Sequence, residues 1–164
     1  MITVHHAGDI DTAEEKHMGE RCTFCFSSPN ECDDIGYHYF IKSSGQIYEA
    51  RKIGYKSEHV KLNNSYKIRI NFLGDYNSEG IITSAHNTLT SEQIDSCISL
   101  VNKLKKYFPL TKLGGHKDYA LDLDATYPGN LLYERLDYLR QNTGLKKPKN
   151  YHKTHARIKY QAYE

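Results

Sequence analysis

Histidine is the most prominent reactive residue type in this chain, because nine of the 164 residues are histidines. Three of them, His5, His59 and His116, lie at expected strand ends or in loops, where side chains can converge on one site. His116 also follows two glycines, which allow the backbone to approach another group closely. A catalytic zinc site needs two or three imidazoles, a thiolate or carboxylate, and one open position. The histidines therefore indicate a zinc site, although any single histidine is more often a core or surface residue.

The loop that follows His116 is rich in carboxylates, which are oxygen ligands that zinc accepts. It contains Asp118, Asp122 and Asp124. A set made of His5, His116 and one of these aspartates would meet the requirement of a zinc site.

Several expected strands must position these residues. Stretches rich in β-forming residues predict strands at 2–6, 36–42 and 46–51, with a hairpin turn at 43–45. Residues 65–73 alternate apolar and polar side chains, which predicts a strand that is buried on one face only.

Helices are expected between the strands. Thr90 and Gln93 form a capping box before a run of apolar residues at helical spacing, which predicts a helix that ends near Leu104. A second helix is expected from about residue 130 to 142, with Gly144 as its stop, and a short first helix is expected to start at Thr12. Because strands and helices interleave, we expect an α/β fold with a central mixed β-sheet flanked by helices.

Composition and charge exclude several classes of protein. Hydrophobic residues make up 38% of the chain, and no apolar run approaches the roughly 18 residues of a membrane-spanning helix. Residues 146–164 carry six basic residues against one acidic residue, whereas residues 1–145 are net acidic. We therefore expect one folded domain over 1–145 and a basic C-terminal extension over 146–164. The first residues read as a strand, so no secretory leader is expected.

Four cysteines add a second question. Cys22, Cys25 and Cys32 could form a structural zinc site or a disulfide, or could be unpaired thiols. Cys97 lies on the apolar stripe of the helix after Thr90, so we expect it in the core.

A series of short motifs runs along the chain in a consistent order. They are Val4-His5-His6, residues 34–41, 45–51, 59–61 and 68–76, Gly115-His116-Lys117-Asp118, and residues 124–129. The series resembles the zinc-dependent N-acetylmuramoyl-L-alanine amidases of the peptidoglycan recognition protein superfamily, over about residues 2–145. The resemblance implies the fold of those amidases.

The resemblance also implies roles for individual residues. His5 and His116 match the first two zinc ligands. Tyr37 matches a tyrosine that orients the attacking water or stabilises the oxyanion, and Thr126 resembles a residue that donates a hydrogen bond to that oxyanion. The positions that would line the muramyl-peptide groove are His59 and Lys61.

The third zinc ligand departs from the family pattern. The family has a cysteine or aspartate directly before the Pro-Gly pair, yet Tyr127 precedes Pro128 here, and tyrosine has a pKa near ~10. The usual eight-residue step from His116 ends on Asp124, which we take as the third ligand. Asp122, Tyr127 and the absence of a third protein ligand are the alternatives.

The implied activity is zinc-dependent hydrolysis of the amide bond between N-acetylmuramic acid and L-alanine in bacterial peptidoglycan. Such an enzyme would act in the periplasm or on the cell wall, as a phage lysin or an antibacterial effector or toxin; a recycling enzyme is the other setting. The alternative is a non-catalytic peptidoglycan-binding module that has lost the third ligand. We expect a monomer whose partners are peptidoglycan and an immunity or inhibitor protein, without nucleic-acid or membrane partners.

Overall fold

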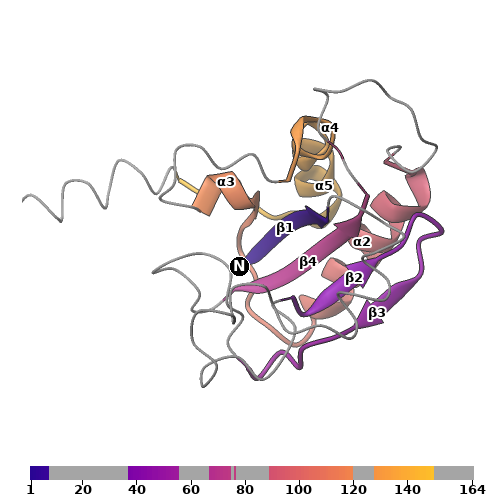
Figure 1. Cartoon of the computed structure of the whole chain (residues 1–164). Coiled ribbons are helices and arrows are strands. Elements are labelled where there is room, and N and C mark those ends of the chain that lie inside the picture. The colour runs from indigo at the N-terminus through magenta and orange to yellow at the C-terminus, as the bar shows by residue number, and fades with distance from the viewer. Residues whose placement is uncertain (8–36, 56–66, 75, 77–88, 120–127, 150–164) are drawn as a thin grey trace, which may run out of the picture.

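A five-stranded mixed sheet organises the described part of the chain (Figure 1). The computed structural model describes residues 1–7, 37–55, 67–74, 76, 89–119 and 128–149. The strands are β1 (Ile2–Ala7), β2 (Tyr39–Ile41), β3 (Ile47–Glu49), β4 (Ile68–Leu73) and β5 (Leu113–Gly115). Their order is β3-β2-β4-β1-β5; β2 and β3 are antiparallel, and the other neighbours are parallel. The predicted α/β fold with a mixed sheet is confirmed.

Four helices accompany the sheet in the described segments. They are α2 (Ser91–Leu104), α3 (His116–Tyr119), α4 (Asn130–Glu134) and α5 (Leu136–Thr143). The predicted capping box starts α2: the Gln93 backbone N–H donates to the Thr90 hydroxyl, and the Gln93 side chain accepts from the Thr90 backbone. Gly144 ends α5 in the left-handed conformation, with φ of 67°, as the sequence predicts. Within these segments, no helix has the length and apolar character needed to cross a membrane.

Three details differ from the sequence predictions. The helix expected over 130–142 is two helices, because the chain tightens at Arg135, whose N–H bonds to the carbonyl of Leu132 three residues earlier. The expectation that β4 is buried on one face only was wrong, since all six of its residues are buried. The residues directly after His116, expected in a loop, form the short helix α3, and Leu113–Gly115 before it form β5, a strand that the sequence did not predict because two of its three residues are glycines.

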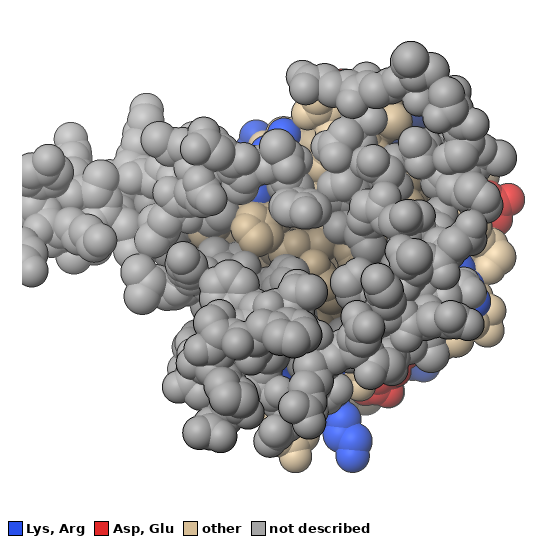
Figure 2. Space-filling model, viewed as in Figure 1, with Lys and Arg blue, Asp and Glu red and all other residues tan. Residues whose placement is uncertain are grey.

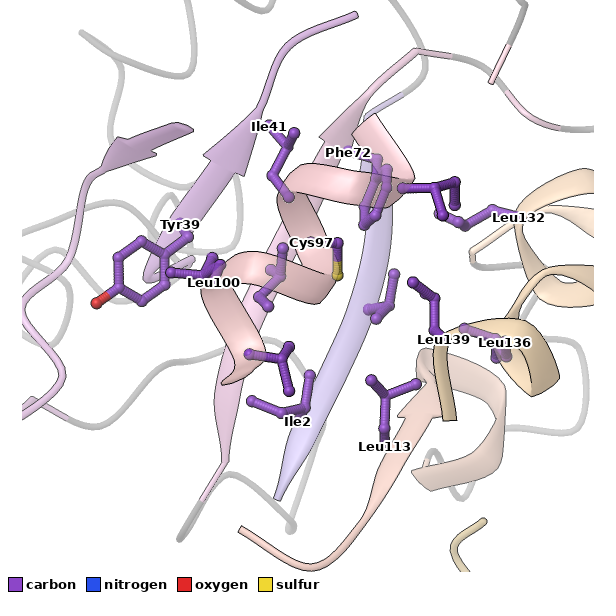
Figure 3. Packing of buried hydrophobic residues seen from close by; sticks show 14 of the residues in the cluster. Ile2, Tyr39, Ile41, Phe72, Cys97, Leu100, Leu113, Leu132, Leu136 and Leu139 are labelled. Carbon is purple, nitrogen blue, oxygen red and sulfur yellow. The ribbon is translucent and has the colours of Figure 1, made fainter. Parts of the chain in front are cut away.

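The main core lies between the sheet and the helices α2 and α5 (Figure 3). Alternate residues of the strands supply one side of it, among them Ile2, Val4, Ile70 and Phe72. We call this side of the sheet the helix face. Cys97 of α2 is fully buried there, which confirms its predicted core position, and burial raises the pKa of its thiol to about 12.

Gln93, also fully buried, ties the start of α2 to the ends of two strands. Its Nε2 donates to the carbonyl oxygens of Ile41 and Leu73, both at 3.1 Å. Its Oε1 accepts from the Tyr76 hydroxyl at 3.0 Å and from the Thr90 N–H at 3.2 Å. A buried carboxamide is therefore fully satisfied on this side of the molecule.

Candidate metal centre

The pairing of β1 with β5 brings together two histidines that are far apart in the sequence. The two strands are parallel, and Val4 is paired with Gly115. The residue that follows each of these two is a histidine: His5 lies inside β1, and His116 is the first residue of α3. Because Val4 belongs to the core on the helix face, His5 projects from the opposite face, which we call the site face.

The two imidazoles face each other through the same type of nitrogen. Nδ1 of His5 and Nδ1 of His116 lie 3.2 Å apart, and the rings meet edge to face with centroids 4.7 Å apart. His5 is 1% exposed, whereas His116 is half-buried. Two imidazole nitrogens bound tetrahedrally to one zinc ion at about 2.0–2.1 Å are about 3.3 Å apart. The spacing of this pair therefore fits two ligands of a single zinc ion.

Tyr37 lies beside the histidine pair. Its ring is edge-on to the His5 ring with centroids 5.2 Å apart, and it also contacts Phe40 at 5.5 Å. It directly precedes the segment that leads into β2, and its carbonyl accepts the Arg51 N–H. The structure therefore brings together three of the residues that the sequence singles out: His5, His116 and Tyr37.

Gly115 and Pro128 lie in close contact. A Cβ atom at Gly115 would come within 2.6 Å of Pro128, so only glycine allows this approach. Pro128 thus packs one residue away from His116, while α3 leaves His116 in the other direction and ends at Tyr119. Pro128, the first described residue after α3, therefore lies close to the strand end that carries His116.

Asp118 holds the turn that carries His116. One carboxylate oxygen accepts the Gly115 N–H at 3.0 Å and a longer bond from Arg140 at 3.4 Å, and the other accepts the Tyr133 hydroxyl at 2.7 Å. Burial, assisted by this bond to the carboxylate, raises the pKa of Tyr133 to about 12. Asp118, one of the carboxylates considered for zinc, is therefore engaged in fixing β5 and α3 to α4 and α5.

Lysines border the same corner of the molecule. The ammonium of Lys117 lies 3.7 Å from the centre of the Tyr133 ring, and that of Lys147 lies 6.0 Å from it. Figure 2 shows blue Lys and Arg side chains in the region between α3 and α4. The edge of the site next to His116 is therefore positively charged.

His38 shows what a structural histidine looks like in this fold. Its Nδ1 accepts the Arg69 N–H at 3.0 Å, and its Nε2 lies 3.2 Å from the Tyr55 carbonyl oxygen, which requires a proton on Nε2. Burial lowers the pKa of His38 below its usual value. Both of its nitrogens have backbone partners, whereas His5 and His116 turn their Nδ1 atoms toward each other.

The remaining predicted site residues lie outside the described segments. They are His59, Lys61, Asp124 and Thr126, together with the alternative ligands Asp122 and Tyr127 and the cysteines Cys22, Cys25 and Cys32. Among the described residues, no group of three or more histidines, cysteines or acidic residues is arranged to hold a metal ion. The histidine pair is thus the described part of the candidate centre.

Sequence reasoning missed Asn71, a buried residue of β4 that is paired with His5. The strand alternation places it on the same face as His5, and this was the available signal. The pattern could not indicate that the polar side of β4 is buried.

Comparison with known proteins gives a consistent result. Residues 1–130 match the family described as N-acetylmuramoyl-L-alanine amidase. Peptidoglycan-recognition protein SD of Drosophila simulans is 28% identical over 138 residues, which are 80% of this chain and 68% of that protein. An N-acetylmuramoyl-L-alanine amidase of Mus musculus is 31% identical over 104 residues, 63% of this chain but 18% of the mouse protein. The structure of the endolysin amidase LysCS from Clostridium intestinale URNW superposes with a TM-score of 0.68 at 25% identity, covering 89% of this chain and 84% of that one.

Proposed function

From the premise that this chain belongs to the N-acetylmuramoyl-L-alanine amidase family, we propose that it is a zinc-dependent amidase of bacterial peptidoglycan. The bond cleaved would be the amide between the lactyl group of N-acetylmuramic acid and L-alanine. Water adds to the carbonyl carbon and the carbon–nitrogen bond breaks. The products are a carboxylate on the glycan and a free amine on the stem peptide.

The observation that carries this proposal is the pair of Nδ1 atoms, on His5 and His116, 3.2 Å apart. Two imidazoles whose Nδ1 atoms face each other at this spacing suit one zinc ion, whereas both nitrogens of His38 face backbone groups. We assign the third ligand to Asp124, with Asp122 and Tyr127 as alternatives. The described residues that flank these candidates support this assignment, because α3 begins at His116 and Pro128 packs against Gly115.

Zinc bound by these residues would lower the pKa of a bound water toward about 7 and polarise the carbonyl oxygen of the amide. The protein's own groups do the rest. Tyr37, in ring contact with His5, would orient the water or donate its hydroxyl proton to the developing oxyanion. Thr126 would be a second donor to that oxyanion, and His59 and Lys61 would contact the muramyl peptide.

A non-catalytic peptidoglycan-binding module is the second candidate. It is favoured by Tyr127, which stands directly before Pro128-Gly129 where the resembling amidases have a cysteine or aspartate. In that case the site face would bind the muropeptide without cutting it.

Digestion of purified sacculi in the presence of zinc tests the enzyme. We expect new alanine amino termini, about one zinc ion bound per chain, and loss of at least about a thousandfold in hydrolysis for His5→Ala or His116→Ala. If the wild type binds muropeptides but holds no zinc and releases no amines, the binding module is the correct function.

Tyr37 and Tyr39, two residues apart, allow a matched test of whether the Tyr37 hydroxyl takes part in catalysis. Tyr37→Phe should lower the rate of hydrolysis by about tenfold to a thousandfold. Tyr39→Phe should leave it unchanged, because Tyr39 packs in the core on the helix face. Equal activity of the two variants would remove Tyr37 from the mechanism.

A further inference from the structure

Asn71 buries a carboxamide that the described protein does not satisfy. The residue is fully buried, and within the part of the chain that the structure describes neither Nδ2 nor Oδ1 has a hydrogen-bond partner. A buried amide normally finds partners, because losing its bonds to water without replacement is costly. The two orphaned atoms therefore require a group that is not part of the described chain.

The position of Asn71 identifies where that group would sit. In β4, Ile70 and Phe72 belong to the core on the helix face, so Asn71 projects from the site face. It is paired with His5 of β1 on one side and with Phe40 of β2 on the other. These are the two residues whose rings contact Tyr37.

We propose that the Asn71 carboxamide is a substrate-binding group of the site, which hydrogen-bonds the scissile amide next to His5. A carboxamide has an acceptor oxygen and two N–H donors. The substrate amide has a carbonyl acceptor and an N–H donor that point in opposite directions in the trans form, so Asn71 can bind one of them, with Nδ2 donating to the carbonyl oxygen or Oδ1 accepting from the N–H. This assignment rests on the proposed function for the identity of the substrate.

Asn71→Leu, a change of similar size that removes both polar atoms, separates this role from a structural one. Because the variant no longer buries an unsatisfied carboxamide, it should unfold at the same temperature as the wild type or up to about 4 °C higher. Its kcat/KM on a soluble muropeptide should fall by about tenfold to a hundredfold. Unchanged kcat/KM would overturn the proposal, and so would a fall in the unfolding temperature without loss of activity, which indicates a structural water.

Thr3→Val is the matched control. Thr3 is also fully buried on the site face, its Oγ1 has no partner among the described residues, and it is two residues before His5 in β1. We expect the same or higher unfolding temperature and wild-type kcat/KM. An equal loss of activity in both variants would mean that any change on this face disturbs the site, and would overturn a specific role for Asn71.

A measurement on the wild type covers the case in which Asn71→Leu fails to fold. Muramyl tripeptide is added to protein stripped of metal, so that it is bound without being cut, and side-chain amides are followed by NMR. The Asn71 amide protons should shift and exchange more slowly, whereas those of Asn142, which is exposed and bonded to Tyr138, should not change. Shifts of other site resonances without a shift of Asn71 would overturn the proposal.

These results are separable from the fate of the proposed function. If the wild type does not hydrolyse sacculi, the amidase proposal fails, and the NMR experiment still reports whether Asn71 contacts a bound muropeptide. If the wild type hydrolyses them and Asn71→Leu does so equally well, only the role of Asn71 fails.

Discussion

Two buried carboxamides on opposite sides of the same sheet have opposite surroundings. Gln93, where α2 meets the ends of β2 and β4, uses both of its polar atoms in four hydrogen bonds to the protein. Asn71, in β4, has no partner for either atom among the described residues. The fold can therefore satisfy a buried amide completely, and the contrast indicates that Asn71 serves something other than stability.

The two faces of the sheet also differ in the charged groups that they bury. The helix face buries mostly hydrocarbon side chains, together with the thiol of Cys97. Lys67, Arg69, Asn71 and Leu73 alternate onto the site face along β4 and the position before it; all four are buried, and three of them are polar or charged. Burial, reinforced by the nearby Arg69, lowers the pKa of Lys67 to about 7. The helix face thus buries mainly hydrocarbon, whereas the site face buries charged and polar groups.

The largest effect expected from this contrast is for Gln93→Leu. The substitution leaves the carbonyl oxygens of Ile41 and Leu73 with one donor fewer and removes the reciprocal half of the capping box. We expect a loss of about 3–5 kcal/mol in the free energy of unfolding, with unchanged hydrolysis per folded molecule. Denaturant titration measures this, and Asn71→Leu, which should not destabilise, is the comparison. A similar loss for both would remove the difference between the faces.

Asp118→Asn tests the junction at the edge of the sheet. An amide cannot balance the charge of Arg140, and its NH₂ group cannot accept bonds from Gly115 or Tyr133. We expect a loss of about 2–3 kcal/mol. Asp137→Asn is the control, since Asp137 pairs with the same arginine but its side chain is 81% exposed, so the change should be within about 0.5 kcal/mol. Equal effects in chemical denaturation would show that the buried carboxylate is not an anchor.

Much of the helix face was predictable because its signals are local. The capping box of Thr90 and Gln93 fixes the start of α2, and alternation assigns each residue of β4 to a face. Local signals also predicted the first strand and placed His5 in its second half. The contact of His5 with His116 depends instead on the parallel pairing of β1 and β5, which no local signal predicts.

The features that sequence reasoning missed depend on contacts between distant segments. Strand β5 is three residues long with two glycines, and it forms because β1 pairs with it rather than because of its own propensity. The polar residues of β4 predicted a solvated face, and their burial is decided by the rest of the fold. Asn71 could therefore be assigned to the correct face but could not be recognised as an unsatisfied group.

The smallest effect expected concerns the cost of burying Lys67, and it has a defined dependence on pH. The ordinary lysine pKa near 10.5 applies to the unfolded chain, whereas the folded value is about 7. Between these values the unfolded state binds the additional proton, so this group makes stability rise with pH above 7. Below pH 7 both states are protonated, and the full penalty of the buried charge is present.

Lys67→Met should remove this dependence while keeping a side chain that packs on Tyr119, whose ring lies 4.5 Å from the Lys67 ammonium. Between pH 7.5 and 8.5 the wild type should gain about 1 kcal/mol in unfolding free energy relative to this variant. Lys52→Met, at an exposed position, should show the wild-type dependence. Parallel pH profiles for wild type and Lys67→Met would mean that folding does not disfavour the charge of Lys67, and the contrast between the two faces would then rest on Asn71 and Gln93 alone.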